Sequence, residues 1–585
     1  MSMSVEFSLE KSKDNFNILK MSNEERQVYI GSKYNMKNYL EKFINDIGNI
    51  AKEDSVFLIL GIGGGEELKC LKNKYPESKI IILEPIKELI SYAYKNNIIK
   101  FTESDNVYVR FIDNKVKTTF MLKGLLQEYE VKRIVFKCLY NYDKIFKNQL
   151  CEITDIVKTS LIDKIIDINT NIYFSRRWFD TMISNLEYMI KSSTVDNLKN
   201  SMENIPSIIV SAGPSLEKNI KQLHNVKNNM LILSGGRTLK PLTKENIVPN
   251  LLGVIDAAKV SYDLVQGYIE HTKVPLLFYE GTNEEVVKNH KSEKVFFTKS
   301  AFIEKCFENN DINLVMGGSI AHILTTFSIY IGCNPIIFIG QDFAYTNEKY
   351  HADIAINQFT SKEQNKAKNE NSLYVKDIKG DIVRTNVVLD SFRRDMELII
   401  KQYPKITFIN ATEGGANIEG TINMSLSDAI KKYKLNSKVE LNINNRFNED
   451  IKNRFLNILT EAFKSSNVIK KQCQTGIDIV NKLSKHVALK DNCKINESLK
   501  KLKYVDDNIK NNYKSLEILY TLLYPISFTI MSKYKAENDK EIIEKSKFLY
   551  ESLLKNVEYA IMKIQQSINN IKNMEIKNAE VRGGK

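Results

Sequence analysis

Five short apolar runs between residues 202 and 434 constrain the fold more than any other feature of this sequence, because each ends in small or polar residues. They read PSIIVSA, NMLILSG, LLGVID, PLLFYEG and NPIIFIGQD, and they alternate with segments of helical spacing. Such alternation predicts a largely parallel sheet in an α/β fold. Ligands of parallel sheets bind at the carboxyl ends of the strands, so the residues there are the first candidates for a site.

The strand ends of this region share a small, hydroxylated, basic or acidic character. They carry Ser211, Gly213, Ser215, Ser234, Gly235, Gly236, Arg237, Asp256, Glu280, Gln341 and Asp342. Each has an ordinary alternative role, since Pro214 and Ser215 are common at helix starts and Asp256 and Ser319 can cap helices. Loops that follow strands do not in general require small or polar residues at five successive strand ends. The repetition therefore indicates a polar site at this edge of the sheet.

Two turns in the region precede helices. One is SAGPSL, from Ser211 to Leu216, and the other is GGS, from Gly317 to Ser319. Turns of this kind present backbone N–H groups and the positive end of a helix dipole, an arrangement that holds phosphate. Two of them in one domain predict a nucleotide site.

The N-terminal region also contains a strand, a glycine turn and a helix, in SVFLILGIGGGEELKCL from residue 55. A second strand ends at Glu84, about 20 residues beyond the turn, where an acid often meets a ribose. This Rossmann-like opening favours a dinucleotide or S-adenosylmethionine. Gly61, Gly63, Gly64 and Gly65 equally suit a tight turn and close helix packing, so both interpretations stay open.

Length and periodicity predict several domains. A chain of 585 residues exceeds what one hydrophobic core usually serves. We expect a Rossmann-like N-terminal domain with a helical extension at residues 1–200, a central parallel α/β domain at 201–435, and an all-α helical bundle at 436–585. The last expectation rests on two stripes of helical spacing, the first from Phe447 to Phe463 and the second from Leu553 to Ile571.

Charge and cysteine usage exclude several classes of protein. The net charge of +13 comes from 72 Lys and only 12 Arg, whereas nucleic-acid clamps favour Arg, so we expect no nucleic-acid ligand. Seven cysteines without a CxxC pair indicate a reduced, cytoplasmic protein. The start has no signal-peptide core, and the apolar stretch Ile518 to Met531 is too short to span a bilayer.

The motifs together resemble a known family. The run SAGPSL, the helix behind GGS, and IFIGQDFAYTNEKYHAD resemble the motility accessory factor (Maf) flagellin glycosyltransferases, whose central domain is similar to bacterial sialyltransferases. The resemblance implies that Ser211, Gly213, Pro214 and Ser215 face a nucleotide and that Gly317, Gly318 and Ser319 close over cytidine monophosphate (CMP). Gln341 belongs to the same nucleotide-binding set, and Arg237 and Asp256 are weaker members of it.

The resemblance also implies a reaction. It implies transfer of a nonulosonic acid, a sialic-acid-like sugar, from its CMP-activated donor to Ser or Thr hydroxyls of flagellin, as flagellar assembly and motility require. Tyr345 and Tyr350 would stabilise the departing phosphate. His351 would be the base, with a pKa near its ordinary value, although the sialyltransferase histidine lies further downstream. Asp342 would orient the acceptor or the sugar. No metal or other cofactor is expected.

Neighbouring segments are expected to border the same site. Arg384, Arg393 and Arg394 either meet a carboxylate of the substrates or belong to an exposed helical face. The loop Glu413 to Gly420 is expected beside the pocket, and residues 357–371 are expected to form a lid. His322 is expected to be packed or to lie near the nucleotide.

Three other functions remain open on the sequence. The archaeal pterin diphosphokinase family has a similar central domain, and its activity would require ATP and Mg²⁺. A methyltransferase centred on Gly61 to Gly65 is a second enzyme class. A non-catalytic motility or scaffold protein is the third possibility, and on any of the readings the helical C-terminal region is available to bind a protein acceptor.

Overall fold

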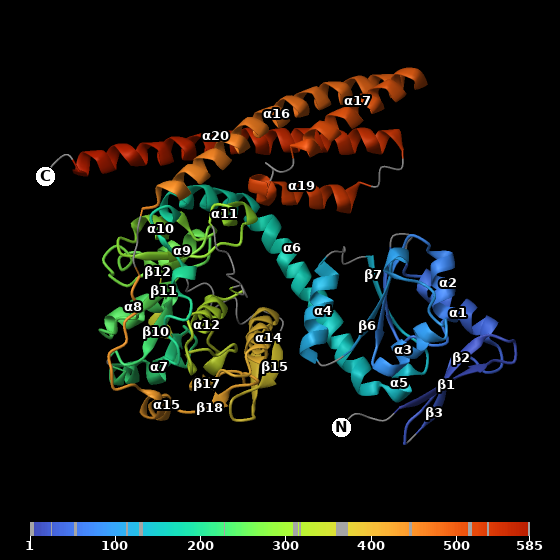
Figure 1. The fold of residues 1–585 in the computed structure, drawn as a ribbon, viewed down its shortest axis with the longest axis horizontal. Helices are drawn as coiled ribbons and strands as arrows, with labels where there is room; N and C mark the ends of the chain where they lie inside the picture. The colour runs from blue at the N-terminus through green and yellow to red at the C-terminus, as the bar shows by residue number, and fades with distance from the viewer. Residues whose placement is uncertain are drawn as a thin grey trace. The chain divides into compact units, whose positions relative to one another are not determined.

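The computed structural model describes residues 5–24, 26–51, 55–112, 115–127, 133–226, 228–307, 314, 318–357, 372–443, 447–512, 517–534 and 538–582. The chain divides into two compact units, residues 1–169 and 170–585 (Figure 1). The division lies within helix α6 (Lys147–Met189), earlier than the boundary predicted at residue 200.

Unit 1 is an α/β unit with two sheets. Strands β1 (Glu6–Lys11), β2 (Asn17–Ser22) and β3 (Gln27–Ile30) form an antiparallel sheet that the sequence analysis did not predict. A parallel sheet has the order β6-β5-β4-β7, with β4 at Val56–Leu60, β5 at Lys79–Glu84, β6 at Val107–Phe111 and β7 at Ile134–Cys138. The helices are α1 (Met36–Gly48), α2 (Glu66–Lys74), α3 (Lys87–Lys95), α4 (Lys115–Gln127) and α5 (Tyr142–Ile145). The Rossmann-like strand, turn and helix are therefore confirmed.

Protein side chains occupy the space around the glycine turn of unit 1. A Cβ on Gly61 would lie 2.6 Å from the ring of Tyr142, and one on Gly64 would lie 2.3 Å from the carbonyl oxygen of Asn17. Glu84 accepts hydrogen bonds from Ile62 N at 3.1 Å, from Ile86 N at 3.0 Å and from the Tyr142 hydroxyl at 2.7 Å. The glycines thus permit close internal packing, and the Glu84 carboxylate stabilises the turn through these hydrogen bonds.

Burial raises the pKa of Glu84 from 4.5 to about 7, against its three hydrogen bonds. The folded protein therefore binds a proton that the unfolded chain releases, and the free energy of unfolding falls as pH rises from about 4.5 through 7, by an amount on the order of 3 kcal/mol. We expect Glu84→Gln to flatten this slope in urea unfolding followed by circular dichroism. Trp178, the single tryptophan, reports on unit 2 and serves as the internal control. An unchanged slope would contradict the prediction.

Unit 2 is built on a nine-stranded parallel sheet with the order β18-β17-β14-β9-β10-β11-β12-β13-β8. The five predicted strands form β9 (Ser207–Val210), β10 (Leu231–Gly235), β11 (Leu251–Gly253), β12 (Leu276–Phe278) and β14 (Ile336–Ile339). The sheet also contains β17 (Phe408–Asn410). Three more strands were not predicted: β8 (Ser193–Thr194), β13 (Lys294–Phe296) and β18 (Ile422–Asn423). Strands β8 and β18 have only two residues each, too few for a periodic signal.

Alternate residues of the strands pack on opposite faces of this sheet. Ile209, Leu231 and Leu233 join the core under α12 (Ile320–Tyr330) and α14 (Val387–Gln402). Ile208 and Ile232 join the core under α7 (Leu216–Asn219) and α15 (Leu426–Tyr433). Both faces are covered, as expected for a parallel sheet. The remaining helices of this part are α8 (Gly236–Lys244), α9 (Lys259–Val265), α10 (Glu284–Asn289) and α11 (Ala301–Glu304), and β15 (Leu373–Lys376) pairs with β16 (Ile382–Thr385).

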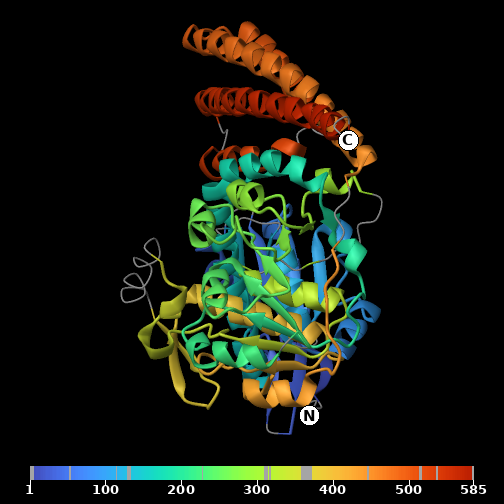
Figure 2. The ribbon, with the colours of Figure 1, turned by 90° about the vertical axis from the view of Figure 1, so that its left-hand side faces the viewer.

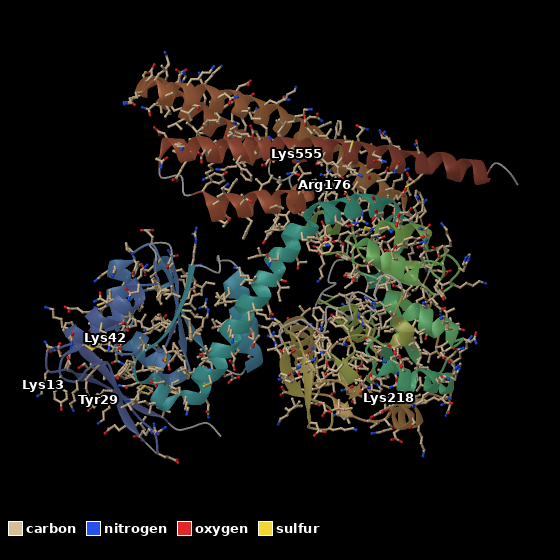
Figure 3. All side chains as sticks on the ribbon, turned by 180° about the vertical axis from the view of Figure 1, so that it is seen from behind. Lys13, Tyr29, Lys42, Arg176, Lys218 and Lys555 are labelled. Carbon is tan, nitrogen blue, oxygen red and sulfur yellow. The ribbon has the colours of Figure 1, made fainter. Side chains whose placement is uncertain are left out.

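The C-terminal region is helical, as predicted, and extends beyond the α/β part of unit 2 (Figure 2). Its helices are α16 (Glu449–Ala488), α17 (Asn492–Asn511), α19 (Tyr520–Lys533) and α20 (Asp539–Arg582). Phe455 and Val557 share one core with Phe179 of α6 and Phe278 of β12. Arg176 of α6 lies over the ring of Tyr559 of α20, 3.8 Å from its centroid (Figure 3). The regions predicted as separate domains at 201–435 and 436–585 therefore share a hydrophobic core.

Candidate functional site

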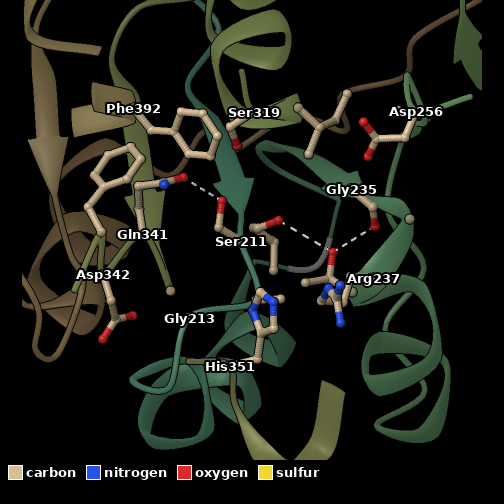
Figure 4. A pocket seen from close by; sticks show the side chains of 18 of the residues that line it. Ser211, Gly213, Gly235, Arg237, Asp256, Ser319, Gln341, Asp342, His351 and Phe392 are labelled. Atoms are coloured by element: carbon tan, nitrogen blue, oxygen red, sulfur yellow. Dashed lines mark hydrogen bonds between the residues drawn. The ribbon is translucent and has the colours of Figure 1, made fainter. Parts of the chain in front are cut away.

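A cavity of about 470 Å³ lies at the carboxyl ends of the unit 2 strands (Figure 4). Strands β10 to β13 extend the sheet from one side of β9, whereas β14, β17 and β18 extend it from the other. This reversal leaves a crevice between the loops that follow β9 and β14, where ligands of open α/β sheets bind. Ten predicted site residues line the cavity: Ser211, Gly213, Arg237, Asp256, Gly318, Ser319, Gln341, Asp342, Tyr350 and His351.

Four predicted site residues do not line it. Pro214 and Ser215 are buried behind the turn, and Tyr345 is buried beside the cavity. Gly317 lies outside the described residues. The predicted lid at residues 357–371 falls almost entirely outside them as well, with only Asn357 described.

The SAGPSL turn lies against the turn that follows β14. Gly213 N donates to the carbonyl of Gly340 at 2.8 Å, and the Ser211 hydroxyl donates to Gln341 Oε1 at 2.5 Å. A Cβ on Gly213 would lie 2.1 Å from Asp342 Oδ2, so only glycine fits there. Gly340 has φ +61°, a conformation that favours glycine. The two segments singled out in the sequence are thus in direct contact.

Asp342 joins these two turns. Its carboxylate accepts hydrogen bonds from the hydroxyl of Ser215 at 2.6 Å, from Ser215 N at 3.3 Å and from the hydroxyl of Thr346 at 2.5 Å. Burial raises the pKa of the Asp342 carboxyl, and the hydrogen bonds from Ser215 and Thr346 oppose that rise. Its bonding capacity is largely used within the protein, which favours a structural role over the predicted role in orienting a substrate.

We expect Asp342→Asn to lower stability by about 1–3 kcal/mol, because an amide replaces one acceptor oxygen by a donor facing these groups. Nucleotide affinity is expected to fall with it, since the SAGPSL turn loses its anchor. Thermal unfolding and calorimetry of one preparation separate the two roles. A full loss of turnover without a fall in melting temperature would show that Asp342 acts on the substrate instead.

The N-terminus of α8 gives the cavity a positive end. Gly235 is the N-cap and has no side chain, so no side-chain cap covers the first N–H groups of the helix. Arg237 lies in the first turn and lines the cavity together with Gly236. Its charge acts on two neighbours: it opposes the desolvation that raises the pKa of Asp256, and it lowers the pKa of His351. This end of the cavity is suited to an anion.

His351 is half-buried and packs edge-on against Tyr350, with ring centroids 4.6 Å apart. Desolvation and then the Arg237 charge lower the pKa of His351 to about 3, against a hydrogen bond with the Ala212 backbone. The imidazole is therefore neutral at pH 7, and it becomes an effective proton acceptor only when an anion beside Arg237 raises its pKa. The expectation of a pKa near its ordinary value is wrong, because the sequence did not reveal the burial or the arginine.

The two tyrosines of the predicted pair differ in exposure. Their ring centroids lie 5.8 Å apart, and only Tyr350 lines the cavity. The Tyr345 hydroxyl accepts a hydrogen bond from Asn386 Nδ2 at 2.6 Å, and the Arg384 guanidinium lies 4.2 Å from its ring centroid. Tyr350 is therefore the member placed to meet a ligand.

The three arginines expected near the substrates are ion-paired. Arg384 bonds to Glu348 at 2.9 Å. Arg393 bonds to Asp390 and Glu397, each at 2.6 Å, and Arg394 bonds to Asp390 at 3.2 Å. None of them lines the cavity.

The glycine-rich loop 413–420 does not line the cavity either. Ala416 N donates to the carbonyl of Asp342 at 2.7 Å, so the loop supports the turn after β14 from behind. Its glycines permit this approach, since a Cβ on Gly415 would lie 2.3 Å from that carbonyl oxygen.

An aromatic wall on the other side of the cavity was missed by the sequence analysis. Phe343, Phe392 and Leu389 line it, and a Cβ on Gly318 would lie 2.1 Å from the ring of Phe392. His322, buried as predicted, positions this wall. Its Nδ1 accepts from Ser319 N at 3.2 Å, so Nε2 carries the proton and donates to the Phe392 carbonyl at 2.8 Å.

The Ser319 side chain also serves its own helix. It caps α12 by accepting from Ala321 N at 3.3 Å. Two polar groups at this helix end are thus used internally, and the α8 end is the better candidate for holding phosphate.

Two further observations concern the described residues as a whole. No helix among them combines the length and apolar character needed to cross a membrane. No three of their His, Cys, Asp and Glu side chains are grouped so as to hold a metal ion.

Two comparisons with known proteins give a match, one to a family model and one to solved structures. A family model described as 6-hydroxymethylpterin diphosphokinase MptE-like matches residues 180–348. No curated protein sequence matches the chain. Among solved structures, one described as MAf glycosyltransferase from Magnetospirillum magneticum AMB-1 is similar, with a TM-score of 0.52 and 14% identity over 99% of this chain and 95% of that one. The resemblance predicted from the motifs is confirmed at the level of fold, which this chain shares with that MAf glycosyltransferase along nearly its whole length.

Proposed function

We propose that this protein is a glycosyltransferase that moves a nonulosonic acid from its CMP-activated donor to Ser or Thr hydroxyls of flagellin. One observation carries the proposal: a cavity at the reversal point of the sheet combines a positive helix end with Tyr350 and His351. The shared fold with a MAf glycosyltransferase supports it. The reaction is placed in the cytoplasm, where flagellin is made.

Each part of the cavity has a role in this reaction. The donor phosphate lies at Gly236 and Arg237, where N–H groups and a guanidinium favour an anion. The Tyr350 hydroxyl donates to the phosphate as it leaves, which stabilises the developing charge. The bond between the anomeric carbon and the phosphate oxygen breaks while the acceptor oxygen bonds to that carbon. The acceptor proton passes to His351, which is neutral at pH 7.

The two tyrosines offer a matched test of this assignment. Tyr350→Phe removes the hydroxyl of a side chain that lines the cavity, and we expect transfer to slow by about a hundredfold with CMP affinity nearly kept. Tyr345→Phe removes an equally conservative hydroxyl that is bonded to Asn386, and we expect it to lower stability with little effect on the rate. Equal rates in the two variants would refute the role of Tyr350.

A second function is favoured by one finding, the match of residues 180–348 to the MptE-like family model. A diphosphokinase would bind ATP with Mg²⁺ in the same cavity. Calorimetry with CMP, with ATP and Mg²⁺, and with S-adenosylmethionine separates these functions, and Arg237→Ala shows whether binding is in the cavity. Tight ATP binding without CMP binding would replace the proposal.

The acceptor requires a separate measurement. Intact-mass analysis of flagellin from cells with and without this protein is expected to show a loss of nonulosonic acid mass in its absence. Restoration by the native protein but not by the Tyr350→Phe variant would separate an enzyme from a scaffold. Unchanged flagellin mass would exclude flagellin as the acceptor.

A further inference from the structure

Helices α16 and α17 form an antiparallel hairpin whose tip, residues 482–503, is unusually basic. Seven of these 22 residues are lysine, compared with 72 of 585 in the whole chain. The acids of the segment are Asp491 and Glu497, which leaves a formal charge of +5. The fraction of lysine in the hairpin tip is therefore higher than in the chain as a whole.

The two acids neutralise only two of the lysines. Asp491 pairs with Lys494 at 3.1 Å, and Glu497 pairs with Lys501 at 2.6 Å. The other five are exposed and have no ion pair within the part of the chain that the structure describes: Lys482, Lys485, Lys490, Lys500 and Lys503. Helix α20 packs along α16 through Tyr550, and residues 539–547 at its start carry three acids and three lysines, which cancel.

The apex of the tip presents an apolar side chain to solvent. Leu489 is 76% exposed, more than any other leucine among the described residues. It is held in a fixed turn, since Leu489 N donates to the Lys485 carbonyl at 3.0 Å and Asp491 N donates to the His486 carbonyl at 3.1 Å. Lys490 completes the turn with φ 55°. At a rise of about 1.5 Å per residue, Lys485 of α16 lies roughly one helical turn from Leu489.

We propose that the hairpin tip binds the surface of an anionic lipid bilayer. A bilayer presents negative headgroups and, directly beneath them, an apolar layer, which together match the lysines and the apical leucine. A nucleic-acid backbone would match the lysines and leave Leu489 in water. The association is weak, reversible and reduced by salt, because exposed charges provide most of it.

Vesicle sedimentation of the full-length protein tests the proposal, with phosphatidylcholine vesicles that contain or lack phosphatidylglycerol. We expect binding to the anionic vesicles only. Replacing Lys482, Lys485 and Lys490, which have no ion pair among the described residues, by Gln is expected to weaken it about a hundredfold, at roughly fivefold per lysine. The matched control replaces three exposed lysines of unit 1, Lys87, Lys95 and Lys100, by Gln and is expected to change binding by less than about threefold.

Leu489→Asn separates a bilayer from other anionic partners. It changes no buried contact, and we expect it to weaken vesicle binding about tenfold while leaving the melting temperature unchanged. Binding to a labelled DNA duplex is measured beside it. No binding to anionic vesicles, equal loss in the unit 1 control, or vesicle binding that is insensitive to Leu489→Asn and matched by DNA would each overturn the proposal.

Discussion

Arg237→Ala is expected to weaken CMP binding by about a hundredfold. The guanidinium lies in the first turn of α8 and lines the cavity, where it supplies both charge and hydrogen-bond donors for a phosphate. A charge-assisted hydrogen bond of this kind contributes about 1.5–3 kcal/mol, and the backbone N–H groups of the helix alone would not replace it. Isothermal calorimetry with CMP measures the loss directly.

Two variants serve as controls for Arg237→Ala. Arg237→Lys keeps the charge and loses the planar fork, so we expect an affinity between those of the native protein and the alanine variant. Arg176→Ala removes an arginine that lies over Tyr559, away from the cavity, and should leave the affinity unchanged. Native CMP affinity in Arg237→Ala would place the phosphate elsewhere and would refute the orientation proposed for the donor.

His351→Ala is expected to lower kcat by about a hundredfold to ten-thousandfold, the usual contribution of a positioned general base. The side chain lines the cavity beside Tyr350, and its pKa of about 3 keeps it neutral at pH 7. His224→Ala, which changes an exposed histidine on another segment, is the matched control and should keep native turnover. Full activity in His351→Ala would assign the proton transfer to another group.

The pH dependence of turnover follows from the same histidine. The functional form is the neutral one, so activity is lost only as pH falls through its pKa. For the free enzyme that pKa is about 3, and we expect kcat/KM to show no acidic limb from His351 above about pH 5. A bound phosphate beside Arg237 would offset the arginine charge and raise the pKa of His351. NMR titration with and without CMP is expected to show this rise, and an unchanged pKa would place the phosphate away from His351.

Local sequence was sufficient to predict strands and helices where an apolar pattern repeats along the chain. The strands from Ile208 to Phe338 and the helical stripe around Phe455 were predicted from apolar periodicity, because burial on a sheet face or helix face imposes that spacing. Gly213 and Gly340 were visible as glycines in turns. The reason that nothing larger fits, an Asp342 oxygen and a Ser211 carbonyl, comes from the folded contact between the two turns.

Features built from distant segments were not predictable in this way. Tyr142 fills the space around the Gly61 turn from 81 residues away, and Phe392 of α14 forms a cavity wall against Gly318. A glycine-rich turn has the same sequence whether a cofactor or a tyrosine approaches it. Unit 1 ends at residue 169 rather than at the predicted 200 for a related reason, since the short strand β8 joins a sheet whose other strands come later in the chain.

By itself, the sequence determined that this protein has a parallel α/β region with polar strand ends and a helical C-terminus, because strand and helix periods are properties of neighbouring residues. Only the tertiary structure decided which candidates meet. It turned Tyr350 and His351 toward the cavity, buried Tyr345 against Asn386, and used Asp342 to join two turns. Exposure, pKa and hydrogen-bond partners depend on segments that lie far apart in the chain, and folding alone brings these segments together.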